Sequence, residues 1–561
     1  MNEPRGSEPV LKAIPLGGLG EIGLNMMVLE YDDTILLIDS GLMFPEEDML
    51  GIDIVIPDFG YLHRNRSRLR ALIVTHGHED HIGAIPFLLR DFRIPIYGTR
   101  LTLALIREKL REYGLAERTK LVEVAPRQKI SVGPFGVEFI QVCHSIPDGV
   151  GLAVRTPVGI LVHSGDFKID HTPVDGKRFD MARFGAYGEE GVLALFSDST
   201  NAERLGYTLS EKDVGRTLRE VFQECSGRII VAVFASNLHR IQQVIHLARE
   251  FNRKVLLNGK SMVANVRLAR ELGYLDFPPD EEIALQDLSR RPDSQVLMLT
   301  TGSQGEPMSA LSRMAFNDHK KLKVKPGDTI VLSSRFIPGN ERTIQNIINN
   351  LYRQGAEVIH EQVRDIHVSG HAYREELKAM INAVRPRYFI PIHGEYRHLV
   401  KHRHLAMSMG IPSQHCFLAE NGDVISFQGD GKASVEERVE TGRVFVDGKG
   451  VGDVAGIVLR DRRHLSEDGL VIASLVLNHE TKEILSGPDI LSRGFIHEGT
   501  KSEILDDAKC LVLEVFDRML LEPGFEVDCA ELQTEIRKEL KRFFARVLDR
   551  HPVIYPIVVG I

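Results

Sequence analysis

The sequence predicts a multidomain α/β protein, and the patterns of strand-like and helix-like segments in three regions of the chain support this prediction. The first third alternates short apolar segments with turns, and from about Thr208 strand-like and helix-like segments alternate. The second pattern is typical of a parallel sheet built from βαβ units. The C-terminal region combines strands with an amphipathic helix at 530–548, which predicts a small α+β domain. A chain of 561 residues is long enough for several such domains.

The first region is expected to form buried strands. Its apolar segments are rich in Val, Ile and Leu and are bounded by Gly, Asp or Pro, which is the composition of core strands. A helix is expected between them at 101–113. The strand segments read MMVLEY, TILLID, ALIVTH, VEFIQV and GILVHSGD.

The middle region predicts a helix at 214–224 and then a strand, a helix and a strand in RIIVAVFA, LHRIQQVIHLARE and KVLLNG. A short strand is expected from His367 onward, and another in RYFIPIHGEY. The polar, Gly-rich stretch at 429–452 indicates a linker or a hairpin.

One motif matches a dinucleotide-binding pattern but is not expected to bind a dinucleotide. Residues 18–23, GLGEIG, match the dinucleotide-binding fingerprint GxGxxG, and Asp39 lies at the expected distance. The fingerprint requires a helix whose N-terminus holds the pyrophosphate. Here two apolar segments joined by Asp32 and Asp33 follow, so we expect a β-hairpin instead.

The composition argues against a membrane or secreted protein and bears on the choice of partner. No run of about eighteen apolar residues is present, and the N-terminus lacks an apolar signal core, so no membrane association is expected. The five cysteines show no CxxC spacing, which favours a reducing, cytoplasmic location. The net charge of −9 disfavours a nucleic-acid partner without excluding one, because bound cations are absent from that count.

The segment ALIVTHGHEDHIG contains four candidate metal ligands within six residues. Residues i and i+2 of an extended segment share a face, so His76 and His78 are expected to hold one metal. Gly77 is expected to allow the close backbone turn. Asp80 and His81 would begin a helix and point to a second metal about 3.5–4 Å away. Imidazole and carboxylate ligands favour Zn²⁺, with Mn²⁺ as the alternative.

This motif resembles that of metallo-β-lactamase-fold hydrolases. The resemblance implies an αββα sandwich in which Asp39 supports the metal site without binding metal. It also implies three later ligands, each at the end of an apolar strand: His144, Asp166, which bridges both metals, and His393.

The 227-residue gap between Asp166 and His393 indicates an inserted domain. The insertion resembles the β-CASP module of nucleic-acid-processing members, whose three motifs match Asp198, His371 and His393. The histidine at the third motif position is similar to what the RNA-cutting branch of the β-CASP family carries there.

Over essentially the whole chain the sequence resembles the bacterial ribonuclease J family, in segments such as GGLGEIGLN, THGHEDHIGA, HSGDFKID and HVSGHA. The expected domains are a metallo-β-lactamase domain in two parts (1–207 and 365–435), a β-CASP domain (208–364), a linker (436–458) and a C-terminal α+β domain (459–561). The resemblance implies a homodimer or higher homo-oligomer through the last domain.

The resemblance also implies the activity. A two-metal-activated hydroxide would cleave RNA, by 5′–3′ exonuclease and endonuclease action, in rRNA maturation and mRNA decay. Asp198 and His371 suit proton transfer. The family suggests Asp198 as donor and His371 as acceptor, although the residues themselves leave that order open.

Two segments are expected to bind phosphate. The first, His367-Val368-Ser369-Gly370-His371, offers imidazole, hydroxyl and backbone N–H groups, and the second, Phe234-Ala235-Ser236, precedes a helix. A helix cap or simple turn is the alternative for each. Together they predict recognition of single-stranded RNA with a 5′-monophosphate. Relatives suggest a structural Ca²⁺ near Gly51, Asp53 and Asp447, for which ordinary loop carboxylates are the alternative.

Three other functions compete with this interpretation. A small-molecule hydrolase of the same fold is disfavoured by the long insertion. A DNA 5′-exonuclease is distinguished mainly by His393, and a non-catalytic RNA-binding protein is disfavoured by the complete ligand set.

Overall fold

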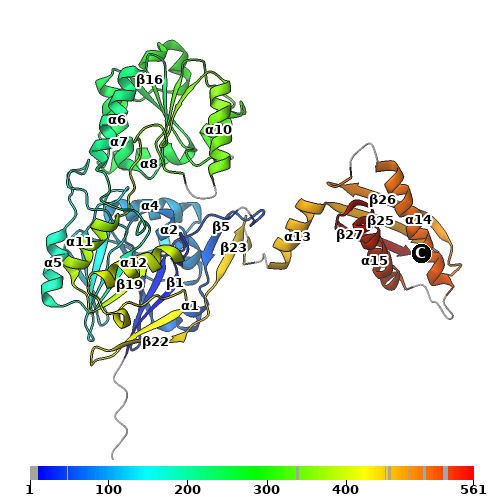
Figure 1. Ribbon diagram of the computed structural model, residues 1–561, viewed down its shortest axis with the longest axis horizontal. Helices are drawn as coiled ribbons and strands as arrows, with labels where there is room; N and C mark the ends of the chain where they lie inside the picture. Colours follow the sequence, from blue (N-terminus) through cyan, green and yellow to red (C-terminus); the bar gives the residue numbers. More distant parts are fainter. Residues whose placement is uncertain are drawn as a thin grey trace, which may run out of the picture. The chain divides into compact units, whose positions relative to one another are not determined.

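The computed structural model describes residues 10–46, 48–306, 308–336, 340–448, 450–452, 456–478, 480–496, 501–521 and 528–561. The predicted linker and C-terminal domain therefore include positions outside the described residues. The chain divides into two compact units, one of residues 1–43 and 56–443 and the other of 44–55 and 444–561. Figure 1 traces the chain from blue to red.

Two mixed sheets face each other in the first unit. The larger has the order β22-β21-β1-β3-β4-β6-β7-β8, and the smaller the order β19-β13-β12-β11-β10-β9. The strands of the larger sheet are β1 (Leu11–Gly17), β3 (Met26–Tyr31), β4 (Thr34–Ile38), β6 (Leu69–Ile73), β7 (Ile96–Gly98), β8 (Leu121–Glu123), β21 (Asp423–Phe427) and β22 (Ala433–Arg438). Those of the smaller sheet are β9 (Lys129–Val132), β10 (Phe135–Gln141), β11 (Val150–Arg155), β12 (Ile160–His163), β13 (Ala194–Asp198) and β19 (Tyr388–Ile392).

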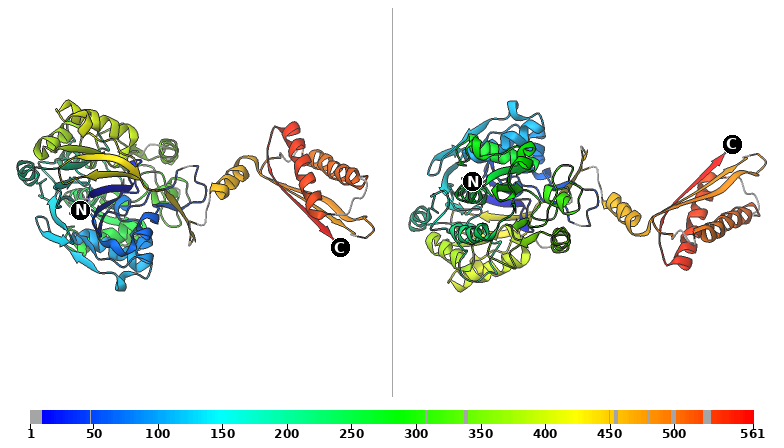
Figure 2. Two further views of the ribbon diagram at one scale, coloured as in Figure 1. Left: turned by 90° about the horizontal axis from the view of Figure 1, so that it is seen from below. Right: turned by 90° about the horizontal axis from the view of Figure 1, so that it is seen from above.

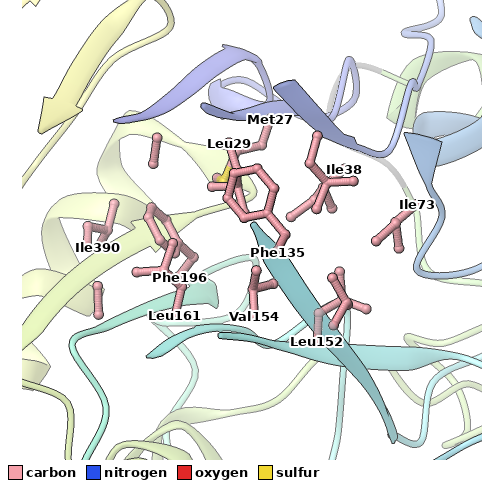
Figure 3. Close-up of a cluster of buried hydrophobic side chains, with 14 of the residues drawn as sticks. Met27, Leu29, Ile38, Ile73, Phe135, Leu152, Val154, Leu161, Phe196 and Ile390 are labelled. Atoms are coloured by element: carbon pink, nitrogen blue, oxygen red, sulfur yellow. The ribbon is translucent and has the colours of Figure 1, made fainter. Parts of the chain in front are cut away.

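The core lies between these two sheets. Leu29 and Ile38 from the larger sheet pack with Phe135, Val154 and Phe196 from the smaller one, and all five are buried (Figure 3). A sheet that buries one face against another needs helices over its outer face. Helices of residues 374–408 lie on one side of the strands and the blue N-terminal helices on the opposite side (Figure 2). The predicted αββα sandwich is confirmed, and the β3–β4 hairpin replaces the dinucleotide fold.

Short helices and small paired strands complete this sandwich. The α-helices are α1 (Gly60–Arg64), α2 (Glu79–Ile82), α3 (Ile85–Asp91), α4 (Arg100–Glu112), α5 (Met181–Glu190), α11 (Arg374–Val384) and α12 (Tyr396–Ser408). The 3₁₀ helices are 66–68, 116–118 and 413–415, and the short strands β2 (Leu19–Gly20) and β20 (Gly394–Glu395) pair with each other.

The inserted region is a parallel sheet in the order β15-β16-β14-β17-β18, flanked by helices (green in Figure 1). Its strands are β14 (Ile229–Ala232), β15 (Lys254–Asn258), β16 (Val296–Thr300), β17 (Thr329–Leu332) and β18 (Glu357–Ile359). Its α-helices are α6 (Glu211–Glu224), α7 (Leu238–Glu250), α8 (Lys260–Glu271), α9 (Ala310–Ala315) and α10 (Glu341–Arg353), and 279–281, 285–290 and 293–295 are 3₁₀ turns.

The strand expected from His367 onward is wrong. Residues 365–373 contain no strand and run irregularly back to α11. Side chains, not a neighbouring strand, bind their backbone: Asn201 and Thr208 donate to the carbonyl of His371, and the His144 ring contacts the carbonyl of Gly370.

The second unit contains a three-stranded sheet of order β26-β25-β27. One face packs on two long helices through Leu475, Val515 and Phe544. Part of the segment expected to be a linker is strand: β22 extends to Arg438, and β23 and β24 form a short hairpin. The elements are β5 (Ile54–Pro57), β23 (Arg443–Asp447), β24 (Gly450–Val451), α13 (Gly456–Asp468), β25 (Leu470–Leu477), β26 (Ile484–Arg493), α14 (Lys501–Leu520), α15 (Cys529–Leu548) and β27 (Val553–Gly560). None of the described helices could cross a membrane.

Candidate metal centre

Strand ends bring the predicted ligands together at one edge of the sandwich. β12, β13 and β19 are parallel, so their carboxyl ends meet, and Asp166, Asp198 and His393 lie at or just beyond those ends. The opposite sheet contributes the loop after β6, which leads into α2. Four overlapping groups of possible ligand atoms result, each within 4.8 Å, and two of them consist of predicted metal ligands alone: His76, His78 and His144, and Asp80, His81, Asp166 and His393. The other two groups include His371.

The first group consists of three imidazoles. Nδ1 of His78 lies 3.1 Å from Nε2 of His76 and 3.1 Å from Nε2 of His144. The other nitrogen of His76 contacts Thr75 Oγ1 at 3.1 Å, and that of His144 contacts the Gly370 carbonyl at 2.8 Å. A carbonyl only accepts, so His144 carries its proton on Nδ1 and directs the Nε2 lone pair into the group.

The second group is centred on one carboxylate oxygen. Oδ2 of Asp166 lies 3.0 Å from His393 Nε2, 3.2 Å from His81 Nε2 and 3.6 Å from His76 Nε2. His76 belongs to the first group, so Asp166 lies between the two groups. Asp80 completes the second group, with Oδ2 3.6 Å from His81 Nε2.

Asp39 orients this group from outside. Its carboxylate accepts from the backbone N–H and the hydroxyl of Thr75, each at 2.8 Å, and contacts His81 Nδ1 at 2.8 Å. Because the carboxylate only accepts, the His81 proton stays on Nδ1 and the Nε2 lone pair faces Asp166. Thr75, which was not singled out from the sequence, links Asp39 to His76.

The electrostatics fit a pair of cations. Burial lowers the pKa of His78 and of His144 to about 3, so both rings are neutral at pH 7. Burial opposes the charged form of His81 as well, but the carboxylates of Asp166 and Asp80 outweigh it and raise that pKa. His78 and His144 thus offer neutral lone pairs, and the Asp166 and Asp80 carboxylates favour a positive charge at His81 that a divalent ion would supply in place of the ring proton.

Two glycines are required for space. Neither Gly77 nor Gly370 has a positive φ, so the lack of a side chain, and not the backbone conformation, is what each position requires. A Cβ on Gly77 would lie 2.6 Å from Leu105 Cδ1. A Cβ on Gly370 would lie 2.6 Å from Cε1 of the His144 ring, so only glycine lets this segment approach that ring.

Asp198, which is buried, and His371, which is half-buried, form a pair beside the metal groups. Asp198 Oδ2 lies 2.8 Å from His371 Nδ1. Burial opposes the charged imidazole, yet Asp198 outweighs it and raises the pKa of His371 to about 9. The His371 ring contacts those of His144 and His393, with centroids 4.9 and 5.4 Å apart. The pair therefore faces both groups.

The two predicted phosphate-binding segments are partly exposed except at Val368 and Gly370. Val368 and Ala235 pack into the same apolar cluster, so the segments border one core. Ser369 Oγ accepts from Asn201 Nδ2 at 2.8 Å and from the His371 N–H at 3.1 Å. Asn201 was missed from the sequence, although it belongs to the DSTNA motif that begins at Asp198.

The residues of the suggested calcium site lie in the second unit. Asp53 accepts from the N–H of Gly448 at 2.7 Å, and Asp447 pairs with Arg462 at 2.5 Å. The same guanidinium lies beside Gly51, 2.7 Å from where a Cβ would be. Among the described residues, none of the acidic and histidine groups able to hold a metal includes these positions.

Comparisons with known proteins cover nearly the whole chain. Family models match residues 19–197 (Metallo-beta-lactamase superfamily), 226–351 (Ribonuclease J, beta-CASP domain), 355–417 (Zn-dependent metallo-hydrolase RNA specificity domain) and 457–561 (Ribonuclease J C-terminal domain).

The chain is 42% identical to Ribonuclease J2 of Bacillus subtilis over 98% of this chain and 99% of the relative. It is 43% identical to Ribonuclease J of Thermus thermophilus over 99% and 96%, respectively. A crystal structure of a protein of unknown function from Enterococcus faecalis superposes with a TM-score of 0.52 at 16% identity, covering 74% of this chain and 100% of that one, which shows the fold alone.

Proposed function

This chain belongs to the ribonuclease J family, and we propose that it degrades single-stranded RNA in the 5′–3′ direction from a 5′-monophosphate end and also cuts RNA internally. Membership makes the protein a metal-dependent hydrolytic ribonuclease with RNA as its substrate. The observation that carries the proposal is the pair of ligand groups that meet at Asp166, and the two segments predicted to bind phosphate support it because they border one core.

His76, His78 and His144 would hold one divalent ion, and Asp80, His81 and His393 the other, with Asp166 between them. When bound, such ions lower the pKa of water to about 7 and neutralise charge that develops on the phosphate. The nitrogen-rich donor set favours Zn²⁺, and the carboxylates leave Mn²⁺ as an alternative.

The residues of the chain supply orientation and proton transfer. Asp39 holds the His81 proton on Nδ1, and the Gly370 carbonyl does the same for His144. Asp198 and His371, 2.8 Å apart, would exchange protons with the attacking water and with the departing 3′-oxygen of the RNA.

The 5′-end preference would come from 367–371 and 234–236. A hydroxyl and free N–H groups bind a phosphate monoester, whose oxygens only accept. Ser369 is suited to this role because its oxygen already accepts two hydrogen bonds, which leaves its proton for a ligand. A bulkier 5′-triphosphate would fit such a site poorly.

A homo-oligomer is supported by the second unit. The face of its sheet opposite the two helices exposes Tyr555, Ile557 and Val559 of β27 and Leu491 of β26. Ile472 of β25 pairs with both Leu491 and Tyr555 across the sheet, so these residues form one apolar face. We propose that a second copy of the chain covers it.

Three finer assignments rest on the family alone: action in rRNA maturation and mRNA decay, a cytoplasmic location, and a structural Ca²⁺ at Gly51, Asp53 and Asp447. The Arg462 guanidinium beside Asp447 makes the calcium assignment the weakest of the three, because a cation would have to displace it.

The function is tested with one RNA carrying a 5′-monophosphate, a 5′-hydroxyl or a 5′-triphosphate, beside the matching DNA and a chelated control. We expect fastest turnover of the monophosphate and no cleavage after chelation. Ser369→Ala should reduce the monophosphate preference by a loss on the order of 1–3 kcal/mol while sparing internal cleavage. Equal wild-type rates on all three ends would contradict end sensing, and preferred cleavage of DNA would favour the DNA exonuclease.

A further inference from the structure

A cluster of fully buried charges joins the inserted domain to the metal-binding domain. Arg240, in the first turn of α7, is 0% exposed, and Glu211 and Lys168 are 1% and 2% exposed. Removing a charged group from water costs several kcal/mol unless partners satisfy it. The hydrogen bonds that satisfy these buried charges therefore also fix the relative positions of the segments that carry them.

Every nitrogen of the Arg240 guanidinium has an acceptor. Nη2 donates to Glu211 Oε2 at 2.7 Å, Nε donates to Gln243 Oε1 at 2.9 Å, and Nη1 donates to the backbone carbonyl of Ile366 and to Ser333 Oγ. Glu211 in turn accepts from Lys168 Nζ at 3.4 Å. Lys168 also lies 3.6 Å from Asp170, so two positive and two negative groups balance.

Arg240 connects the two predicted phosphate-binding segments. It follows Ser236 by four residues on the same turn into α7, and its guanidinium holds Ile366, three residues before Ser369. The opposite end of the cluster reaches the metal groups, because the Lys168 N–H donates to the carbonyl of Cys143, the neighbour of His144. A shift of the guanidinium would therefore change the spacing between the two segments.

We propose that Arg240 is a positioning residue for 5′-end selection, because its rigid fork of donors holds residues 366–369 at a fixed spacing from residues 234–236. His371 is held separately, by Asp198 at its ring and by Asn201 and Thr208 at its carbonyl. The inference rests on the proposed end-sensing function. A lysine keeps the charge but offers one compact donor group in place of the planar fork, so it cannot hold Glu211 and the Ile366 carbonyl together in the same way. Internal cleavage does not use the end site and should not need this spacing.

Two variants test the proposal. Arg240→Lys keeps the charge, and the double variant Arg240→Met with Glu211→Met removes one charge of each sign, which leaves Lys168 paired with Asp170. Replacing a buried ion pair by apolar residues is often tolerated, so the double variant guards against simple unfolding. Arg249→Lys, at the exposed end of the same helix, is the matched control.

The readouts are kcat and KM for one RNA with a 5′-monophosphate or a 5′-hydroxyl, cutting of a circular RNA that has no end, and the melting temperature. We expect the monophosphate-to-hydroxyl ratio of kcat/KM to fall at least tenfold in both Arg240 variants, mainly through KM. Cutting of the circle should stay within about threefold of wild type, and Arg249→Lys should change neither.

An unchanged ratio in folded Arg240 variants would overturn the inference while leaving end sensing intact. An equal loss on circular and linear RNA would also overturn it, because Arg240 would then support the catalytic domain as a whole. Absence of a monophosphate preference in the wild type would instead overturn the proposed function on which the inference rests.

Discussion

Replacing Asp39 by asparagine tests how the metal centre is built. The carboxylate of Asp39 meets three groups at 2.8 Å: the N–H of Thr75, the hydroxyl of Thr75, and Nδ1 of His81. An asparagine has one accepting oxygen and one donating NH₂ group. If its oxygen serves the Thr75 N–H, the NH₂ group faces His81 Nδ1. That nitrogen must then accept, which moves the ring proton to Nε2, the atom 3.2 Å from Asp166.

The size of the effect follows from this change of tautomer. Partners that orient metal-binding histidines are worth about 10–100-fold in metal affinity. A wrong histidine tautomer costs a serine protease about 10⁴ in kcat. We therefore expect the Asp39→Asn variant to bind one of the two proposed metals at least tenfold more weakly and to lose on the order of 10²–10⁴ in kcat. Stability should fall by about 1–3 kcal/mol, because a buried hydrogen bond is mismatched.

The assay is metal content per chain after dialysis against limiting Zn²⁺, with RNA turnover and thermal unfolding in parallel. Asp33→Asn changes an exposed carboxylate in the same hairpin and should behave as wild type. The reasoning is refuted if Asp39→Asn keeps two metals at wild-type affinity and turns over RNA at the wild-type rate.

Three further predictions follow. His76→Ala or Asp166→Ala should abolish RNA cleavage while the circular dichroism spectrum stays that of the wild type, and full activity in either variant would contradict the two-metal site. Gly370→Ala should slow cleavage of every RNA by displacing the His144 ring, whereas Gly185→Ala, whose Cβ would meet no atom within 4 Å, should not. Burial would raise the pKa of Glu211, but Arg240 and Lys168 lower it to about 2. The stability it contributes is thus complete above the unfolded pKa of about 4.3 and is lost as pH falls toward 2, so urea midpoints between pH 5 and pH 3 should fall more in wild type than in the Arg240→Met, Glu211→Met variant.

The sheets and the metal-binding loop could be predicted from the sequence because their signals are local. Strand TILLID and its turn are set by apolar residues and Asp32-Asp33, and the β3–β4 hairpin forms there. The segment THGHEDH places four candidate metal ligands directly after a strand, a pattern that points to a metal site. His144 and His393, separated by hundreds of residues, were placed only through a family resemblance.

The contacts that could not be predicted from the sequence join residues that are far apart in the chain. Arg240 and Glu211 look like ordinary charges of amphipathic helices, and no local pattern marks them as buried partners. The irregular course of residues 365–373 likewise depends on Asn201 and Thr208, more than 150 residues earlier in the chain.

These long-range contacts lie where the chain enters and leaves the inserted domain. The chain enters it near Glu211 and leaves it near Ile366, and Arg240 binds both residues, so the two junctions border the buried cluster. Any movement of that domain at its junctions must therefore act on the Lys168–Glu211–Arg240 cluster and on the segment that carries Ser369 and His371. A hydrolase without the insertion would bind the metals but would lack this buried cluster. In the proposed function, the cluster would couple the inserted domain, which would bind the RNA end, to the metal centre that would cut the RNA.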